Sequence, residues 1–167
     1  MKRTNLAVPT FVFLYALSAA AQSAGQKSFD AMKALVGNWE GKTSMGDTAR
    51  VSFRLTANGS VLMSEIQNPA HGHAEDMVSM IHMDGNRLLL THYCPTGNQP
   101  RMQASVSPDG KSITFDFVDA TNLASRDAGH MQSVVFTFVD ANHHLEEWHY
   151  VDHGNTEIMR FDLQKKS

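Results

Sequence analysis

The chain has 167 residues, with 14 lysines and arginines against 17 aspartates and glutamates, and it contains one cysteine. No basic run occurs in it, which argues against nucleic acid or an anionic membrane surface as a partner. A lone cysteine cannot form an internal disulfide bond, so we expect packing alone to stabilise the fold.

Residues 1–21 have the layout of a secretory signal peptide. A positive start at residues 2–3 is followed by an apolar run over residues 6–17 and by small residues at 18–21. This order predicts cleavage after Ala21, which removes two basic residues and moves the formal charge from −3 to −5. The apolar run is shorter than the ~20 residues of a membrane-spanning helix, so the sequence predicts an exported protein, periplasmic or secreted, without a membrane span.

The mature chain is predicted to form one domain over residues 28–167, after a flexible leader at 22–27. Apolar residues at helical spacing follow Ser28, which is available as an N-cap, and Gly37 ends the pattern. We therefore expect a short helix over residues 28–36. Its apolar positions are Phe29, Met32, Leu35 and Val36.

Beyond this helix, strand-length runs alternate with turn sequences. Asn58-Gly59 and Asp84-Gly85 are typical hairpin turns. Between such turns apolar residues recur at every second position, as at Val51, Phe53 and Leu55. About ten strands are predicted, near residues 38–45, 49–57, 60–67, 76–83, 87–93, 100–107, 111–118, 129–139, 144–152 and 156–164.

Most of the connections are short enough for hairpins, so strands adjacent in sequence should be adjacent in space. Longer loops are expected at residues 68–75 and 119–129. A meander of many antiparallel strands removes its exposed edges by closing on itself. We therefore predict an all-β fold, an antiparallel up-and-down β-barrel of about eight to ten strands with a short N-terminal helix. An open sandwich with Greek-key crossings is the alternative.

A helix followed by Gly37-x-Trp39 at the start of an antiparallel meander resembles the lipocalin and wider calycin pattern, in which the tryptophan closes the narrow end of the barrel. With four further motifs, the mature chain is similar to a family of exported, lipocalin-like bacterial proteins of unknown function. The resemblance covers most of residues 28–165 and implies a fold and a compartment. The four motifs are Thr91-His92-Tyr93-Cys94, Gly97–Met102, Phe117–Asn122 and Gly129-His130-Met131.

A more distant similarity is to the haem-binding nitrobindin barrels, which also begin with Gly-x-Trp-x-Gly, here Gly37 to Gly41. That similarity implies haem as a cofactor. It places the iron-ligating histidine at no one position in this sequence, so the cofactor is left unknown.

His92 and Cys94 stand out at the end of the strand expected over residues 87–93. Alternation places Leu88 and His92 on one face, and Cys94 joins them if the strand continues. A thiol and an imidazole two residues apart could form half of a metal site, or a nucleophile with its base. No second thiol supports this, and Pro95 turns the chain directly afterwards. We therefore expect Cys94 to be a buried corner residue and His92 to serve a pocket.

Arg101 and Gln103 share a face of the next strand, and antiparallel pairing brings Arg101 close to the end of the strand that holds His92. A guanidinium inside a barrel requires a carboxylate or an anionic ligand, because an unpaired buried charge is very costly. Glu65 and Glu147 are the candidate partners. Structural pairing and ligand anchoring both remain open for Arg101.

His130 and His149 lie on strands near the expected pocket, and His149 shares a face with Glu147. If His92, His130 and His149 point into one cavity, their imidazoles could hold zinc, copper or haem iron. They would otherwise be hydrogen-bonded polar lining, or exposed. The spacing does not require convergence, so no residue is assigned as a metal ligand.

Four other histidines are predicted to be solvated, because His71 and His73 fall in an expected loop and His143 and His144 in an expected turn. The long loop expected from Asp119 should hydrogen-bond its own backbone, or act as a lid at the barrel mouth.

The ten methionines either fill gaps in the core or line an adaptable apolar pocket. No nucleophile elbow, zinc-protease motif, phosphate-binding glycine loop or EF-hand loop occurs.

The leading hypothesis is an exported protein that binds a small hydrophobic or amphipathic molecule in a mainly apolar barrel pocket. The alternatives are a haem- or metal-dependent enzyme that uses the pocket histidines, and a structural or interaction barrel with a filled interior. The expected polar anchors are His92, Arg101, Gln103, His130, Glu147 and His149.

Overall fold

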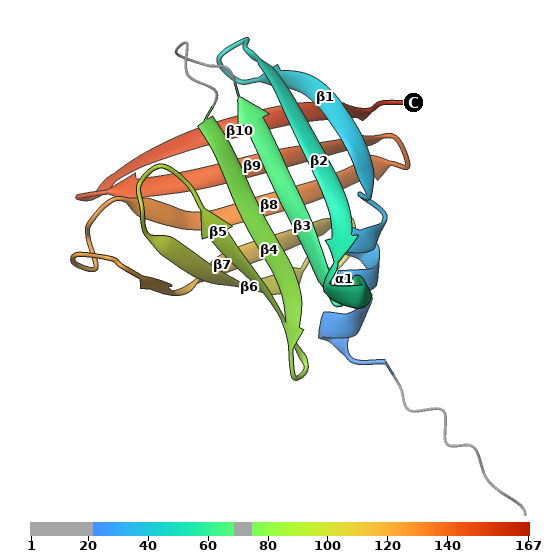
Figure 1. Ribbon diagram of the computed structural model, residues 1–167, viewed down its shortest axis with the longest axis horizontal. Coiled ribbons are helices and arrows are strands. Elements are labelled where there is room, and N and C mark those ends of the chain that lie inside the picture. The colour runs from blue at the N-terminus through green and yellow to red at the C-terminus, as the bar shows by residue number, and fades with distance from the viewer. Residues whose placement is uncertain (1–21, 69–74) are drawn as a thin grey trace, which may run out of the picture.

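The alternating segments pair into a closed β-barrel in which neighbouring strands are antiparallel (Figure 1). The computed structural model describes residues 22–68 and 75–167. Its strands are β1 (Gly37–Thr43), β2 (Thr48–Thr56), β3 (Val61–Asn68), β4 (Glu75–Asp84), β5 (Arg87–Tyr93), β6 (Gln99–Val106), β7 (Ser112–Thr121), β8 (His130–Asp140), β9 (His143–Asp152) and β10 (Asn155–Lys165).

Each strand pairs with the strands before and after it in sequence, and β1 pairs with β10 to close the barrel. This order confirms the predicted all-β antiparallel barrel and excludes the open sandwich. The predicted strands are present with similar limits. The main difference is β7, which continues to Thr121 through part of the segment expected to be a loop.

The helix α1 (Ala24–Lys33) precedes the first strand, and it both begins and ends earlier than the predicted range of residues 28–36. Ser23 is its N-cap and accepts a hydrogen bond from the backbone N–H of Gln26 at 3.2 Å. Ser28 is therefore not the cap. It lies inside the helix, where its hydroxyl donates to the carbonyl oxygen of Ala24. The additional turn carries no apolar periodicity, so the hydrophobic pattern did not indicate it.

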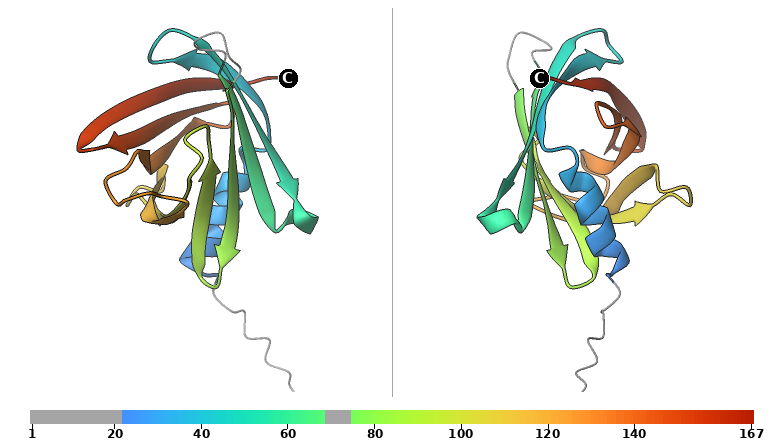
Figure 2. Two further views of the ribbon diagram at one scale, coloured as in Figure 1. Left: turned by 60° about the vertical axis from the view of Figure 1, so that its left-hand side comes forward. Right: turned by 90° about the vertical axis from the view of Figure 1, so that its right-hand side faces the viewer.

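One end of the barrel is closed by α1 and the start of β1, as Figure 2 shows. Phe29 and Met32 of α1 are buried, and so is Leu35, two residues after the end of the helix. Trp39 is 2% exposed, and its indole N–H donates to the carbonyl oxygen of Leu35 at 2.7 Å. The tryptophan of the Gly-x-Trp motif thus ties the helix to the barrel and fills its closed end.

The opposite end, here called the open end, is where a ligand could enter. Strand direction alternates, so successive turns fall at opposite ends of the barrel. Because β1 begins beside α1, the turns at residues 44–47, 94–98, 122–129 and 153–154 lie together at the open end.

A layer of apolar side chains fills the barrel between the two ends. Leu62, Ile81, Leu90, Phe115 and Phe136 are completely buried there. Burying one such side chain contributes ~1.5–3 kcal/mol, so this layer is a main source of stability.

The start of β6 and the end of β7 extend past their neighbouring strands at the open end. Within the described residues, β5 pairs with β6 only over Leu89–Thr91, and the pairing of β7 with β8 ends at Asp116. Beyond those points β6 and β7 still pair with each other. Residues 99–100 and 117–121 therefore form a two-stranded extension, here called the β6–β7 flap.

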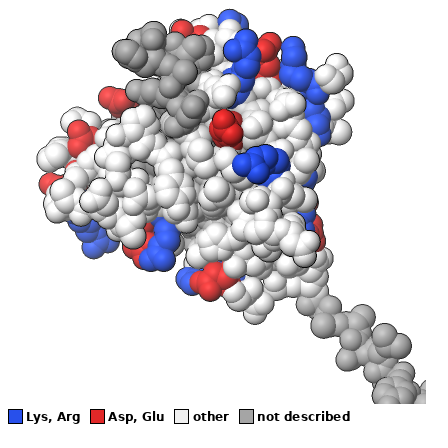
Figure 3. Space-filling model, viewed as in Figure 1, with Lys and Arg blue, Asp and Glu red and all other residues white. Residues whose placement is uncertain are grey.

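The predicted signal peptide at residues 1–21 and the histidines His71 and His73 lie outside the described residues. In the described ranges, no helix combines the length and apolar character of a membrane span. On the face in Figure 3, acidic and basic side chains are interspersed and form no patch of one sign.

Candidate functional site

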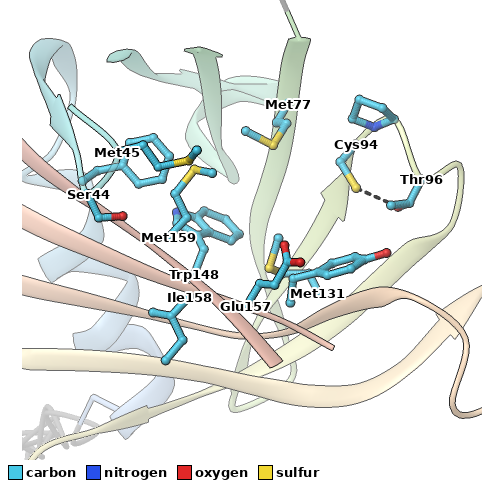
Figure 4. A pocket seen from close by; sticks show the side chains of 13 residues that line it. Ser44, Met45, Met77, Cys94, Thr96, Met131, Trp148, Glu157, Ile158 and Met159 are labelled. Atoms are coloured by element: carbon cyan, nitrogen blue, oxygen red, sulfur yellow. Dashed lines mark hydrogen bonds between the residues drawn. The ribbon is translucent and has the colours of Figure 1, made fainter. Parts of the chain in front are cut away.

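A pocket of about 560 Å³ lies at the open end of the barrel. Its walls come from β4, β8, β9 and β10 and from the turns that follow β1 and β5 (Figure 4). The residues that line it are Ser44, Met45, Met77, Cys94, Pro95, Thr96, Met131, Trp148, Tyr150, Glu157, Ile158, Met159 and Phe161.

Four of these lining residues are methionines that come from separate parts of the fold. Met45 belongs to the turn after β1, Met77 to β4, Met131 to β8 and Met159 to β10. In Figure 4 their side chains point toward a common space. A thioether side chain is flexible and polarizable, so it adapts to irregular ligand shapes and packs well on aromatic rings. The pocket is therefore suited to apolar ligands of more than one outline.

Met131 reaches this pocket because of a β-bulge. The register of β8 with β9 shifts between Met131 and Ser133. His130 and Met131 are consecutive, yet both are buried, at 3% and 9% exposure. A bulge inserts an extra residue into one strand and interrupts the alternation of faces. Simple alternation places Met131 on the face opposite His130, so the sequence did not indicate this lining residue.

Trp148 and Phe161 form the floor of the pocket, next to the packed interior. The indole N–H of Trp148 donates to Oε2 of Glu146 at 2.8 Å. The ring centroid of Trp148 lies 4.8 Å from that of His92. Glu146 and His92 are both 0% exposed. Two buried polar side chains therefore fix the orientation of the floor.

Cys94 and Thr96 lie at the edge of the pocket, in the turn after β5. Sγ of Cys94 is 2.9 Å from Oγ1 of Thr96, and the cysteine is half-buried. The prediction of a buried corner residue is therefore wrong. The strand ends at Tyr93, so the thiol lies at the pocket edge instead of continuing the core face.

Glu157 and Tyr150 face each other in the register of β9 with β10, and both line the pocket. Burial, and then the electrostatic effect of Asp152, Cys94 and Glu157, raises the pKa of Tyr150. The phenol therefore keeps its proton at neutral pH and remains a hydrogen-bond donor. Glu157 gives the rim of an otherwise apolar pocket a negative charge.

His92 faces the barrel interior, as strand alternation predicted, but it does not line the pocket. Its Nδ1 shares a hydrogen bond of 2.9 Å with the hydroxyl of Ser79. Its Nε2 is buried and has no hydrogen-bond partner among the described residues. Burial lowers the pKa of His92 from 6.5 to about 4, so the imidazole is neutral at neutral pH. The structure places His92 beneath the floor, against Trp148.

Arg101 lies on the outer surface of the barrel, whereas its neighbour Met102 is completely buried. Its Nε donates to Oδ1 of Asp119 at 2.6 Å. The predicted partners Glu65 and Glu147 are therefore wrong, because the guanidinium faces outward and cannot reach across the interior. Asp119 itself lies in β7, where a loop was expected.

Gln103 and His130 occupy different surroundings. Gln103 shares the outer face of β6, where its Oε1 accepts from Arg87 at 3.4 Å. His130 is buried, and its two ring nitrogens lie 2.7 Å from the carbonyl oxygen of Ala128 and 3.2 Å from Oε1 of Gln132. Neither residue lines the pocket.

His149 and Glu147 share a face of β9, as predicted, but this is the outer face and not the face toward the expected pocket. Nε2 of His149 is 2.8 Å from Oε1 of Glu147, and Arg160 donates to the other carboxylate oxygen. The hydrogen bond from His149 is the main cause that holds the pKa of Glu147 below its usual range. None of the six expected anchors lines the pocket, so a role for them in ligand binding stays a prediction.

The residues of this pocket do not fit a histidine-ligated haem. His92, His130 and His149 lie in three separate places, and no histidine is found among the described lining residues. The soft donors there are four thioethers and the thiol of Cys94. The described part of the chain also holds no group of three or more His, Cys, Asp or Glu side chains placed to bind a metal ion. We therefore assign no haem chemistry to this site.

A buried polar pair that the sequence did not indicate lies nearer the closed end. His144 and Glu146 are both 0% exposed, and Nε2 of His144 is 3.0 Å from Oε1 of Glu146. The ring of His144 also meets Trp39 edge-on, with centroids 4.3 Å apart. The prediction of a solvated histidine pair is wrong for His144. β9 begins at His143, so the next residue already faces the interior.

Together, the fold and the pocket define a closed ten-strand antiparallel β-barrel with an apolar pocket at one end. No protein-family model and no curated protein sequence matches the chain. Among solved structures, the chain is similar to Rv2717c from M. tuberculosis, with a TM-score of 0.59 and 12% sequence identity. The similarity covers 84% of this chain and 98% of that chain. At this identity the likeness shows the fold alone.

Proposed function

We propose that the protein is exported and binds a small, largely apolar molecule in the pocket at the open end. The observation that supports this is the pocket itself, with about 560 Å³ of space and thioether and aromatic walls. Ligand sites commonly have volumes of ~300–1,000 Å³, apolar walls and a few polar groups that orient the ligand. Here the polar groups are at the rim, at Glu157, Tyr150, Cys94 and Thr96.

Export is the second part of this proposal, and it rests on the signal-peptide layout of residues 1–21. Protein recovered from the periplasm or the culture medium of cells that express the full chain should begin at Gln22. N-terminal sequencing or intact mass measurement checks this. Recovery of the uncleaved chain from the cytoplasm would contradict export without touching ligand binding.

Ligand binding is tested with a neutral, solvatochromic dye such as Nile red, whose emission rises in an apolar site. Met77 and Met80 lie on the same strand, but Met77 lines the pocket whereas Met80 does not. Met77→Gln should weaken dye binding about five-fold, because a polar amide replaces a thioether at the ligand surface. The matched control Met80→Gln should bind the dye with the same affinity as the wild type.

The same experiment separates the proposal from a barrel with a filled interior. A filled interior predicts that the wild type binds no dye, and that native mass spectrometry of the purified protein shows no mass beyond that of the chain. Equal losses in Met77→Gln and Met80→Gln would place the dye outside the pocket, and the proposal would then fail.

A further inference from the structure

The charge of the pocket is one-sided. Among its described lining residues, Glu157 is the one side chain with a full charge at neutral pH, and no Lys, Arg or His is present. Glu157 is exposed at the rim and forms no ion pair with any described residue. A ligand that enters therefore meets an unneutralised carboxylate and no cationic group.

Glu157 also stands at the head of a continuous inward-facing row on β10. Glu157, Met159 and Phe161 alternate along this strand, and all three line the pocket. Residues four apart on a strand are separated by ~13 Å, so the row runs from the rim to the floor. A chain-like apolar ligand can lie along Met159 with its tail on Phe161 and its head group at Glu157. Figure 4 shows Glu157 and Met159 together on the pocket wall.

The aromatic surroundings of Glu157 also favour a cation. Tyr150 lies directly across the strand pair from Glu157. Its phenol is held in the protonated form by burial and by the nearby Asp152, Cys94 and Glu157. The rings of Tyr150 and Trp148 also offer electron-rich surface in the same lining, which attracts cations.

From these observations we propose that the pocket selects amphiphiles with a cationic head group, such as an alkyl ammonium, and discriminates against carboxylates. Glu157 is the residue that contacts the head group. The inference rests on the proposed function, because it requires the open-end pocket to be the ligand site. It specifies the chemical class of ligand that this site takes.

Both attraction and repulsion contribute to this selectivity. An ammonium group beside Glu157 gains an ion pair at a partly solvated rim, and it keeps its remaining hydration. A carboxylate in the same place is repelled by Glu157 and finds no cationic partner among the described lining residues. An alcohol of the same chain length has neither effect and measures the apolar contribution alone.

The test compares dodecyltrimethylammonium, 1-dodecanol and dodecanoate by displacement of Nile red, with the two ionic amphiphiles below their micellar concentrations and the alcohol below its solubility limit. The ammonium should bind about ten-fold more tightly than the carboxylate, with the alcohol between them. Glu157→Gln should remove most of this difference by weakening the ammonium and strengthening the carboxylate, each about three-fold. Asp116→Asn removes an exposed carboxylate outside the pocket and should leave the ratio of the two affinities unchanged.

The outcomes distinguish this inference from the proposed function. The proposed selectivity is wrong if the carboxylate binds as tightly as the ammonium, or if Glu157→Gln and Asp116→Asn change the ratio of these two affinities equally. Binding of the alcohol would in either case still support an apolar site. If none of the three amphiphiles displaces the dye and the dye itself does not bind, both ideas fail together.

Discussion

At the residue scale, His92 and Glu146 are polar side chains in an apolar interior, and both contact the same indole. A buried carboxylate without partners costs several kcal/mol, but Glu146 accepts hydrogen bonds from Trp148 and His144. His92 packs its neutral ring against Trp148 and bonds Ser79 through Nδ1. Because Trp148 is the pocket floor, these buried groups orient the surface that a ligand meets.

The depressed pKa of His92 predicts a pH-dependent stability. Its folded-state pKa of about 4 lies below the ordinary value of 6.5, so between these values the unfolded chain binds a proton that the folded chain does not. The contribution of His92 is therefore fully present above pH 6.5 and is lost as the pH falls toward 4, by up to ~1.4 kcal/mol per pH unit. Urea unfolding of the wild type across this range should show the decline.

His92→Gln supplies the comparison, because it removes the titrating imidazole and leaves all the carboxylates and the other histidines in place. The difference in unfolding free energy between wild type and variant should shrink from neutral to acid pH. A difference that stays constant from pH 4 to pH 7 would show that the folded protein admits the proton on His92.

Alternation along a strand predicted several side-chain directions at this scale and missed others for definable reasons. It correctly placed His92 inside, because β5 is regular up to Tyr93. It failed at Met131, where a bulge shifts the register, and at His144, where the limit of β9 decides which histidine of the pair is buried. Local pattern does not encode a bulge or the first residue of a strand to within one position.

At the scale of elements, the β6–β7 flap is the part of the barrel with the fewest strand partners. It is attached to its surroundings mainly by side chains. Asn98 is 6% exposed, and its Nδ2 donates to the carbonyl oxygen of Gly129 at 2.8 Å. The ring of Phe117 packs against that of His130 at an interplanar angle of 48°, with centroids 4.5 Å apart. The flap borders the open end, so these contacts hold one side of the pocket entrance in place.

Asn98→Ala removes the hydrogen bond to Gly129 and should loosen the flap without unfolding the barrel. A buried hydrogen bond of this kind contributes ~1 kcal/mol, so the backbone amides of Gln99 and of residues 117–121 should exchange about five-fold faster. Hydrogen-exchange mass spectrometry measures this segment by segment. Asn155→Ala, at an exposed position at the start of β10, is the control. Equal acceleration in β1 to β3 would indicate global destabilisation instead of a local effect.

The limits of the elements were largely predictable, and the two departures have physical causes. The helix was expected from Ser28, where apolar periodicity starts, but its first turn is specified by the cap at Ser23 and by backbone bonding. β7 runs on to Thr121 because Thr121 still pairs with Gln99, the first residue of β6. Both departures depend on hydrogen bonds, which the apolar pattern does not report.

At the scale of the whole molecule, the barrel and its strand order followed from consecutive hairpins and the absence of a long crossover. The location of the pocket did not. Its lining combines Met77 from one side of the barrel with Glu157 and Met159 from the other, and these meet only after closure. The sequence singled out the stretch around Cys94 and Arg101, but closure brings only its turn to the pocket. A site assembled from the ends of distant strands has no local signature.

Closure itself depends on a close approach of β1 to β10 at Gly41. A Cβ at this position would lie 1.7 Å from the carbonyl oxygen of Asp162 and 3.0 Å from Cα of Leu163. Both neighbours are backbone atoms of the paired strand, so the seam must move to accept even alanine. The second glycine of the Gly-x-Trp-x-Gly motif is thus required by the geometry of the seam.

We therefore predict that Gly41→Ala lowers the free energy of unfolding by ~3 kcal/mol or more, measured by urea denaturation. Gly46→Ala is the matched control. Gly46 has a φ of +88° and no atom within 4 Å of an added Cβ. Gly46→Ala should therefore lower the free energy of unfolding only by the ~1 kcal/mol that a non-glycine residue costs in a left-handed backbone conformation. An opened seam also exposes the edges of β1 and β10, so Gly41→Ala should associate with increasing concentration in size-exclusion chromatography. If both variants lose the same stability and stay monomeric, the barrel tolerates a wider seam and its closure does not depend on this glycine.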